Sequence, residues 1–223
     1  RNEASLKALI SDLPTSNGQK HDYLIVDFND FEGFKKTISG FLKTHHIDIL
    51  VNNTQGPKAG GTAVMNVPDY QEAFDVLFKC AVFTTQLALK HMIKNQWGRI
   101  INVASVSVKE PLSYLVLSNS IRAALVTWAK TLATDVAKHQ ITVNSILTGY
   151  FDTERIKDLN ATKAQQLGIS IDEVKTNMEQ QVPMKRIGNP RDYGFLVAFI
   201  ASEQGSYITG TQIPIDGGLL KSL

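Results

Sequence analysis

A strand that leads directly into a long amphipathic helix constrains the sequence most strongly. Residues 99–103 form a short apolar run rich in β-branched side chains, which is typical of a buried strand. Small and polar residues follow, and from Tyr114 onward the apolar residues recur at helical spacing. This arrangement places Ser105 at the carboxyl edge of a sheet, which is where ligands bind in open α/β folds.

The rest of the chain alternates expected strands with expected helices. Further strands are predicted at 23–27, 47–52, 141–147 and 213–215, the last followed by a Gly-Gly turn. Helical patterns cover 1–13, 31–42, 68–95, 152–181 and 193–202, with Gly168 as a break. The pattern predicts one α/β domain over residues 1–223, with a doubly wound, mostly parallel sheet and right-handed crossovers.

Composition narrows the function classes. A net charge of +2 is too small to favour nucleic acid or a membrane surface, and no uninterrupted apolar run approaches membrane-spanning length. The single cysteine, Cys80, excludes an internal disulfide and fits a reducing compartment, so we expect a cytoplasmic protein. The five histidines show no metal-ligand spacing, and we expect no metal site.

Motifs in a fixed order resemble the short-chain dehydrogenase/reductase family, and 3-oxoacyl-acyl-carrier-protein reductases in particular. V-N-N-T-Q-G at 51–56 is similar to the family's N-N-A-G, and G-R-I-I-N-V-A-S at 98–105 resembles its fifth strand. V-N-S-I-L-T-G at 143–149 resembles V-N-x-x-x-P-G with Thr148 in place of proline, and 208–218 is similar to the C-terminal signature. The resemblance covers essentially the whole chain. It implies a Rossmann-like fold, NADP or NAD as cofactor, a small carbonyl or alcohol substrate, and a homo-oligomer, either a tetramer or a dimer.

The resemblance also implies an altered catalytic set. The family places a Tyr thirteen positions after its catalytic Ser and a Lys four further on; in this sequence the three positions are Ser105, Ser118 and Arg122. The family's fourth catalytic residue, an Asn, falls on Leu77 or Phe78. An alkanol is a poor acid near neutral pH, so Ser118 cannot replace the phenol. Arg122 can bond ribose hydroxyls and polarise an oxygen, but it does not exchange protons.

Two tyrosines are candidates for the missing acid. Tyr114 lies four residues before Ser118, which is one helical turn if the helix starts that early, and Tyr150 follows Thr148 and Gly149 near the expected nicotinamide position. The alternative for both is ordinary packing, in a loop for Tyr114 and over a strand end for Tyr150.

Cofactor contacts follow from the resemblance residue by residue. The positions implied for the adenosine half are Arg1, Asp27, Phe28, Asn52, Asn53 and Thr54; those implied for the nicotinamide half are Arg122, Thr148, Gly149 and Thr153. Turn formation is the alternative for Asp27 and for the paired asparagines, and helix capping is the alternative for Thr153.

The family's Gly-rich phosphate-binding turn is absent from this sequence. We expect the intact protein to carry about 30–40 further residues before Arg1, the size of a strand–turn–helix–strand unit. The alternative is a short variant that holds its cofactor differently.

Two hypotheses follow. The first is an NAD(P)-dependent oxidoreductase that acts on a carbonyl or alcohol through an atypical active site. The alternative is a catalytically silent protein of the same fold that binds a nucleotide or a protein partner.

Overall fold

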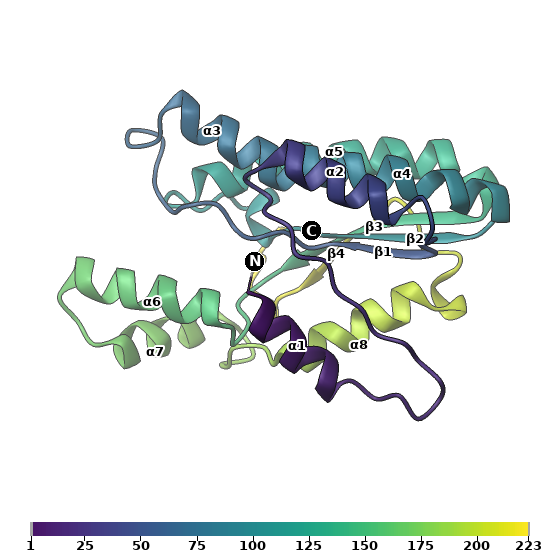
Figure 1. Ribbon diagram of the computed structural model, residues 1–223. Coiled ribbons are helices and arrows are strands. Elements are labelled where there is room, and N and C mark those ends of the chain that lie inside the picture. The colour runs from purple at the N-terminus through teal and green to yellow at the C-terminus, as the bar shows by residue number, and fades with distance from the viewer. Residues whose placement is uncertain (1, 223) are drawn as a thin grey trace.

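A parallel sheet forms the centre of the computed structural model, which describes residues 2–222. Its strands are β1 (Ile49–Asn52), β2 (Gly98–Val103), β3 (Ile141–Thr148) and β4 (Gln212–Ile215). They pair in this order and every pair is parallel. Helices cover both faces of the sheet (Figure 1), so the predicted doubly wound α/β architecture is confirmed.

The helices fall into two layers and a projecting pair. On one face lie α2 (Phe31–Phe41), α4 (Cys80–Asn95) and α5 (Val116–Val136), and on the other lies α8 (Pro190–Ala201). The remaining helices are α1 (Glu3–Asp12), α3 (Val67–Phe74), α6 (Glu154–Leu167) and α7 (Ile171–Gln181), with short turns at Asp75–Lys79, Val106–Val108, Ala137–His139 and Glu203–Gly205. The pair α6 and α7, here called the lid, projects beyond the carboxyl edge of the sheet (Figure 1).

Successive side chains of β2 build two separate cores. Ile100 packs with Met92 and Ala129 under α4 and α5, whereas Ile101 packs with Ile200 under α8. Ile100 and Ile101 are both fully buried. A strand covered on both faces reads as a continuous apolar run, which explains the pattern of residues 99–103.

The strand expected at 23–27 is not formed, and this prediction was wrong. A strand needs a neighbour to satisfy its backbone hydrogen bonds, and within residues 2–222 no strand pairs with this segment. Its Ile25 is 49% exposed. The nearby edge strand β1 likewise leaves Ile49 46% and Val51 39% exposed. Residues 23–27 therefore have the apolar pattern of a strand but form no strand in this structure.

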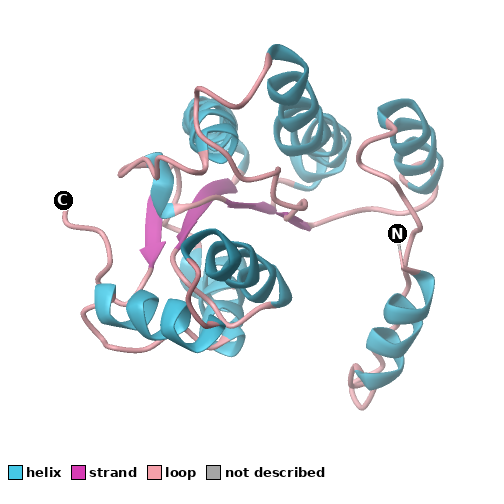
Figure 2. Cartoon of the chain, turned by 90° about the vertical axis from the view of Figure 1, so that its left-hand side faces the viewer, coloured by secondary structure: helices cyan, strands magenta, loops and turns pink. Residues whose placement is uncertain are grey.

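The helix predicted at 1–13 is confirmed as α1, with Asn2 accepting a hydrogen bond from the Ser5 amide at its start. None of its residues is buried. Figure 2 shows it standing apart from the helices that pack on the sheet.

The helix predicted at 68–95 is formed by α3 and α4, joined by a π-helical turn. By length and composition alone, Val67–Asn95 is long and apolar enough to cross a membrane, which inspection of uninterrupted apolar runs did not reveal. In this fold its Ala88 and Met92 lie in the core, and its Thr85 accepts a hydrogen bond from Asn52 of β1. These are the contacts of a helix that packs on a sheet.

A close backbone approach fixes the base of the lid. The Asp152 amide donates to the Gly188 carbonyl at 3.0 Å, and the Gly188 amide donates to the Tyr150 carbonyl at 2.9 Å. A Cβ added at Gly188 would lie 2.8 Å from the ring of Phe151. Only glycine therefore lets these two segments pair beside that ring.

We predict that Gly188→Ala destabilises the protein by about 1–3 kcal/mol, because the added methyl group overpacks the Phe151 ring. The control is Gly194→Ala in α8, where an added Cβ meets nothing within 4 Å; helix propensity makes it neutral or stabilising by up to about 1 kcal/mol. Chemical denaturation of both variants measures the difference. Equal stability of the two would show that the contact at Gly188 is unimportant.

Candidate active site

The register of β2 and β3 places Ser105 at the carboxyl edge of the sheet. Val103 is paired with Ile146, and the Ala104 amide donates to the Ile146 carbonyl at 2.8 Å. Ser105 follows directly, and its hydroxyl oxygen accepts a hydrogen bond from the Ser107 amide at 3.1 Å. Because this oxygen acts as acceptor, the hydroxyl hydrogen remains available for a ligand.

Helix α5 brings Ser118 and Arg122 to the same edge. The two lie one turn apart on one face, and Arg122 Nη1 donates to the carbonyl of Val103, two residues before Ser105. Ser118 is buried, and its hydroxyl forms no hydrogen bond with any residue that the structure describes. The three positions of the altered catalytic set are therefore neighbours at one site.

Arg122 is a cation without a carboxylate partner among residues 2–222. Burial lowers the pKa of its guanidinium to about 10, and the positive charge of Arg155 lowers it further. It still carries its charge at neutral pH. A half-buried cation whose described hydrogen bond goes to a backbone carbonyl suits a polar or anionic ligand group.

The two candidate acids, Tyr114 and Tyr150, lie against each other. Burial raises the pKa of Tyr150 to about 12, and its interaction with the Tyr114 phenol contributes. Tyr114 is 39% exposed and Tyr150 is half-buried, so Tyr114 is the member of the pair that reaches solvent more freely. The backbone of Tyr114 is fixed by the Gly60 amide, which donates to its carbonyl at 2.7 Å.

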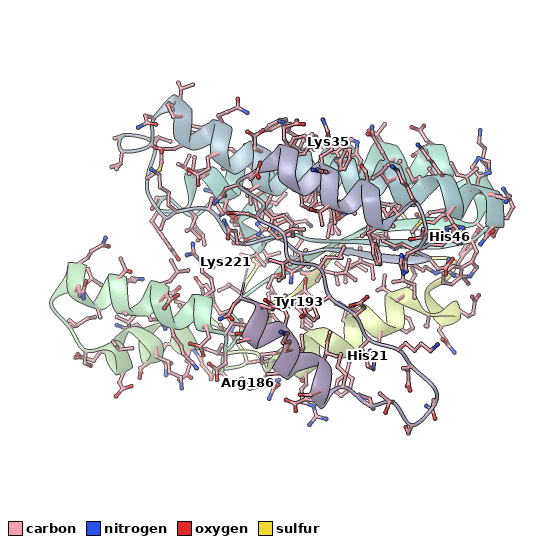
Figure 3. All side chains as sticks on the ribbon, viewed as in Figure 1. His21, Lys35, His46, Arg186, Tyr193 and Lys221 are labelled. Atoms are coloured by element: carbon pink, nitrogen blue, oxygen red, sulfur yellow. The ribbon has the colours of Figure 1, made fainter. Side chains whose placement is uncertain are left out.

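A third tyrosine, which the sequence analysis did not single out, also lies at this edge. Thr148 Oγ1 donates to the hydroxyl of Tyr193 at 3.1 Å, and the Tyr193 ring meets Phe151 edge-on with centroids 5.4 Å apart. Figure 3 shows Tyr193 near the centre of the molecule. The sequence signal for this contact was Thr148, because a hydroxyl at the family's proline position introduces a group that can form a hydrogen bond.

Asn52 has a structural role that the cofactor prediction did not anticipate. Its side chain is buried, and its amide donates to Thr85 Oγ1 at 3.1 Å and to Asn102 Oδ1 at 2.9 Å. These bonds join β1, α4 and β2 in the interior. Both of its donor hydrogens are used there, so the side chain has none for a ribose.

The other described positions implied for the adenosine half lie in two loops, residues 27–30 and the loop after β1, which a hydrogen bond from Gln55 to Asn29 joins at 3.4 Å. Asp27 accepts a hydrogen bond from the Asn29 amide at 3.0 Å, as in a turn, and the Phe28 ring packs on Phe34 with centroids 5.3 Å apart. Asn53 is exposed and Thr54 is half-buried in the loop after β1. Arg1 lies outside the described residues.

Among the positions implied for the nicotinamide half, Thr148, Gly149 and Thr153 lie at or just after the carboxyl end of β3. Thr153 caps α6 by accepting a hydrogen bond from the Ile156 amide at 3.4 Å. Gly149 follows Thr148 so tightly against the last strand that an added Cβ would lie 2.6 Å from the Cα of Asp216. Free hydroxyls at Ser105 and Ser118 and the guanidinium of Arg122 match the donors and acceptors of a ribose with a carboxamide. The donor set therefore fits the nicotinamide half of a dinucleotide better than the adenosine half.

The lid reaches back over this edge. Arg155 Nη2, at the start of α6, donates to the carbonyl of Pro57 in the loop after β1 at 2.6 Å. A small cleft lies beside this loop and is lined by residues 55–58, by α3 and by Leu117, the neighbour of Ser118. Within it, Lys58 and Asp69 form an ion pair.

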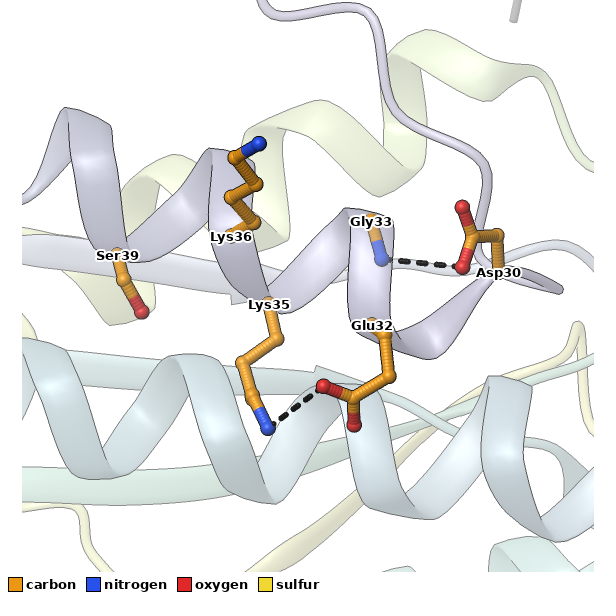
Figure 4. Close-up of a pocket in the computed structure, with 6 residues that line it drawn as sticks. All are labelled: Asp30, Glu32, Gly33, Lys35, Lys36 and Ser39. Atoms are coloured by element: carbon orange, nitrogen blue, oxygen red, sulfur yellow. Dashed lines mark hydrogen bonds and ion pairs between the residues drawn. The ribbon is translucent and has the colours of Figure 1, made fainter.

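A second hollow, on α2, lies away from this edge (Figure 4). Its charged groups satisfy one another, because Lys35 pairs with Glu32 at 2.8 Å and Asp30 accepts a hydrogen bond from the Gly33 amide at 3.0 Å. This hollow shows the features of a capped surface helix.

Comparison with known protein families assigns the chain. The family model described as enoyl-(acyl carrier protein) reductase matches residues 1–220. The NADPH-dependent reductase BacG of Bacillus subtilis is 32% identical over 177 residues, which are 79% of this chain and 68% of that protein. The 3-oxoacyl-[acyl-carrier-protein] reductase FabG of Chlamydia pneumoniae is 31% identical over 219 residues, which are 98% of this chain and 84% of that protein.

Solved structures show the same fold. YwfH, an NADPH-dependent reductase involved in bacilysin biosynthesis, superimposes with a TM-score of 0.92 at 28% identity, over 100% of this chain and 87% of that one. The L-sorbose reductase of Gluconobacter frateurii, solved with NADPH and L-sorbose, gives a TM-score of 0.91 at 26% identity, over 100% of this chain and 86% of that one.

We predict that Asn52→Ala lowers the free energy of unfolding by about 1–3 kcal/mol, because it leaves the Asn102 carbonyl oxygen without its partner in the interior. Asn53→Ala, at the next and exposed position, serves as the control and should change stability by less than about 0.5 kcal/mol. Thermal or urea unfolding measures both. A neutral Asn52→Ala would argue against the structural role.

Proposed function

Because the chain belongs to the short-chain dehydrogenase/reductase family, we propose that it is an oxidoreductase that reduces a small carbonyl compound to an alcohol with NADPH. The observation that carries the proposal is the meeting of Ser105, Ser118 and Arg122 at the carboxyl edge, beside a pair of phenols. The same site run in reverse oxidises the alcohol.

Reduction needs a hydride at the carbonyl carbon and a proton at its oxygen. The nicotinamide nucleotide, when bound, supplies the hydride. Arg122 holds the ribose hydroxyls through its guanidinium, and Ser105 donates a hydrogen bond to the carbonyl oxygen. Ser118 supplies a second hydroxyl beside them, which orients the substrate without acting as an acid.

The proton comes from the phenol pair. Tyr150 keeps its proton at neutral pH, because burial and Tyr114 hold its pKa near 12. Tyr150 donates this proton to the developing alkoxide, which is a far stronger base than a phenolate. The exposed Tyr114 then returns a proton from solvent. Tyr150 and Tyr114 together thus take the role of the single tyrosine that the family pattern places at residue 118.

The substrate class follows from the site and the relatives together. The named proteins include a 3-oxoacyl-[acyl-carrier-protein] reductase and an L-sorbose reductase. We expect a ketone that enters through the cleft beside residues 55–58 and is covered by the lid.

We place this enzyme in the cytoplasm as a homo-oligomer, either a dimer or a tetramer. The exposed aromatic side chains of α8, Phe195 and Phe199, support contact with a second copy, since large apolar groups gain free energy on burial. The alternative of a catalytically silent binding protein rests on the missing Asn together with the substitutions at Ser118 and Arg122, and the relatives named above are reductases.

The first test is binding and turnover. Calorimetric titration of the full chain should give saturable binding of NADPH, weaker binding of NADH, and loss of absorbance from NADPH when β-keto esters or acyl thioesters are added. Binding without turnover of any ketone would favour the silent alternative. Binding of neither nucleotide would overturn the proposal.

A second test separates the two phenols. We predict that Tyr150→Phe lowers kcat at least about 100-fold, because it removes the proton donor. Tyr114→Phe should lower kcat less, since water can still reprotonate Tyr150 slowly. The activity of the wild type should not decline through ionisation of Tyr150 until the pH rises toward about 12, because only the protonated phenol donates.

Tyr207→Phe is the matched control for these variants, because this side chain is fully exposed and should leave kcat unchanged. Retention of full activity by Tyr150→Phe would exclude Tyr150 as the donor.

A further inference from the structure

The hydroxyl of Tyr193 is held in one orientation at the carboxyl end of β3. It accepts a hydrogen bond from Thr148 Oγ1 at 3.1 Å, so its own hydrogen is left free for another acceptor. The edge-on contact with Phe151, at an interplanar angle of 87°, restricts rotation of the ring. Tyr193 is therefore a directed hydrogen-bond donor.

The surroundings keep this donor protonated. Burial raises the pKa of Tyr193 and outweighs the opposing effects of the Thr148 hydrogen bond and the positive charge of Arg122. Tyr150 differs, because its neighbour Tyr114 connects it to solvent and allows a proton to be replaced. Tyr193 is thus suited to hold a ligand oxygen rather than to transfer a proton.

Two departures from the family pattern act on this one phenol. Thr148 stands at the expected proline and supplies the hydrogen bond, and Arg122 stands at the expected lysine and supplies the nearby charge. Tyr193 gives both substitutions a common partner, at the edge where the nicotinamide half fits best.

We propose that Tyr193 is a further cofactor-binding residue: its hydroxyl, held by Thr148 beside Arg122, donates a hydrogen bond to an oxygen of the nicotinamide half of the bound nucleotide. This rests on the proposed function, because it requires a nicotinamide nucleotide at the carboxyl edge. It adds a residue of α8 to a site otherwise built from α5 and the ends of β2 and β3.

The experiment measures nucleotide affinity rather than turnover. The full chain and its Tyr193→Phe variant are titrated with NADPH by calorimetry, and Tyr207→Phe is the control that loses an exposed phenolic hydroxyl. The dissociation constant should rise about 2- to 13-fold in Tyr193→Phe, the effect of one lost hydrogen bond, and stay unchanged in Tyr207→Phe. Thr148→Val removes the holding bond and should weaken binding less. The double variant should be no weaker than Tyr193→Phe, because the two residues act through one group.

Fragments of the nucleotide locate the contact. Nicotinamide mononucleotide should lose affinity for Tyr193→Phe by the same factor as NADPH, whereas adenosine 2′,5′-bisphosphate should lose none. An unchanged dissociation constant for NADPH would overturn the assignment, and so would equal losses for both fragments, which would indicate general damage. If Tyr193→Phe does not fold, Thr148→Val tests the proposal instead, because it removes the hydrogen bond to the Tyr193 hydroxyl and leaves the Tyr193 ring in place. Failure of the wild type to bind NADPH would overturn the proposed function as well. NADPH binding that is unchanged in Tyr193→Phe would overturn only this inference.

Discussion

The hydrogen bond from Arg122 to the carbonyl of Val103 organises the candidate site. It ties the first turns of α5 to the last residue of β2, and so sets Ser118 beside Ser105. Parallel pairing of β2 with β3 brings Thr148 to the same edge. A lysine reaches such a carbonyl with one flexible ammonium group, whereas the planar guanidinium has further N–H groups left for a ligand. The position keeps its anchoring role although it cannot exchange a proton.

The substitutions at the site form a connected set. Loss of the phenol at residue 118 leaves a small hydroxyl there, while other phenols surround the edge: Tyr114 and Tyr150 on the side of the lid, and Tyr193 beneath β3. Under the proposed function, the site has lost a reacting group at its usual position and takes the proton from a neighbouring phenol instead.

Much of the fold could be predicted from the sequence, because periodicity reports burial directly. The runs at 99–103 and 141–147 became β2 and β3, and Gly168 ends α6 in a left-handed conformation as expected of a break. The strand at 23–27 was not predictable, since strand formation depends on a partner and not on local residues alone. The juxtaposition of Ser105, Ser118 and Arg122 followed from motif spacing.

The roles of Asn52 and Tyr193 did not follow from motif spacing. Their partners, Thr85, Asn102 and Thr148, lie far away in the chain and are brought close only by the sheet. Side-chain networks of this kind depend on tertiary contacts that a single sequence does not encode locally.

The unpaired flank of β1 has a consequence for how the molecule opens. Helix α1 buries none of its residues, so little free energy holds residues 3–12 to the rest. Opening of this region costs far less than global unfolding, and its amide protons exchange first with solvent. The central strands β2 and β3 are each paired on both sides and resist such opening. Stability is thus graded across the sheet, and Ser105 and Thr148 lie at the carboxyl ends of its two central strands.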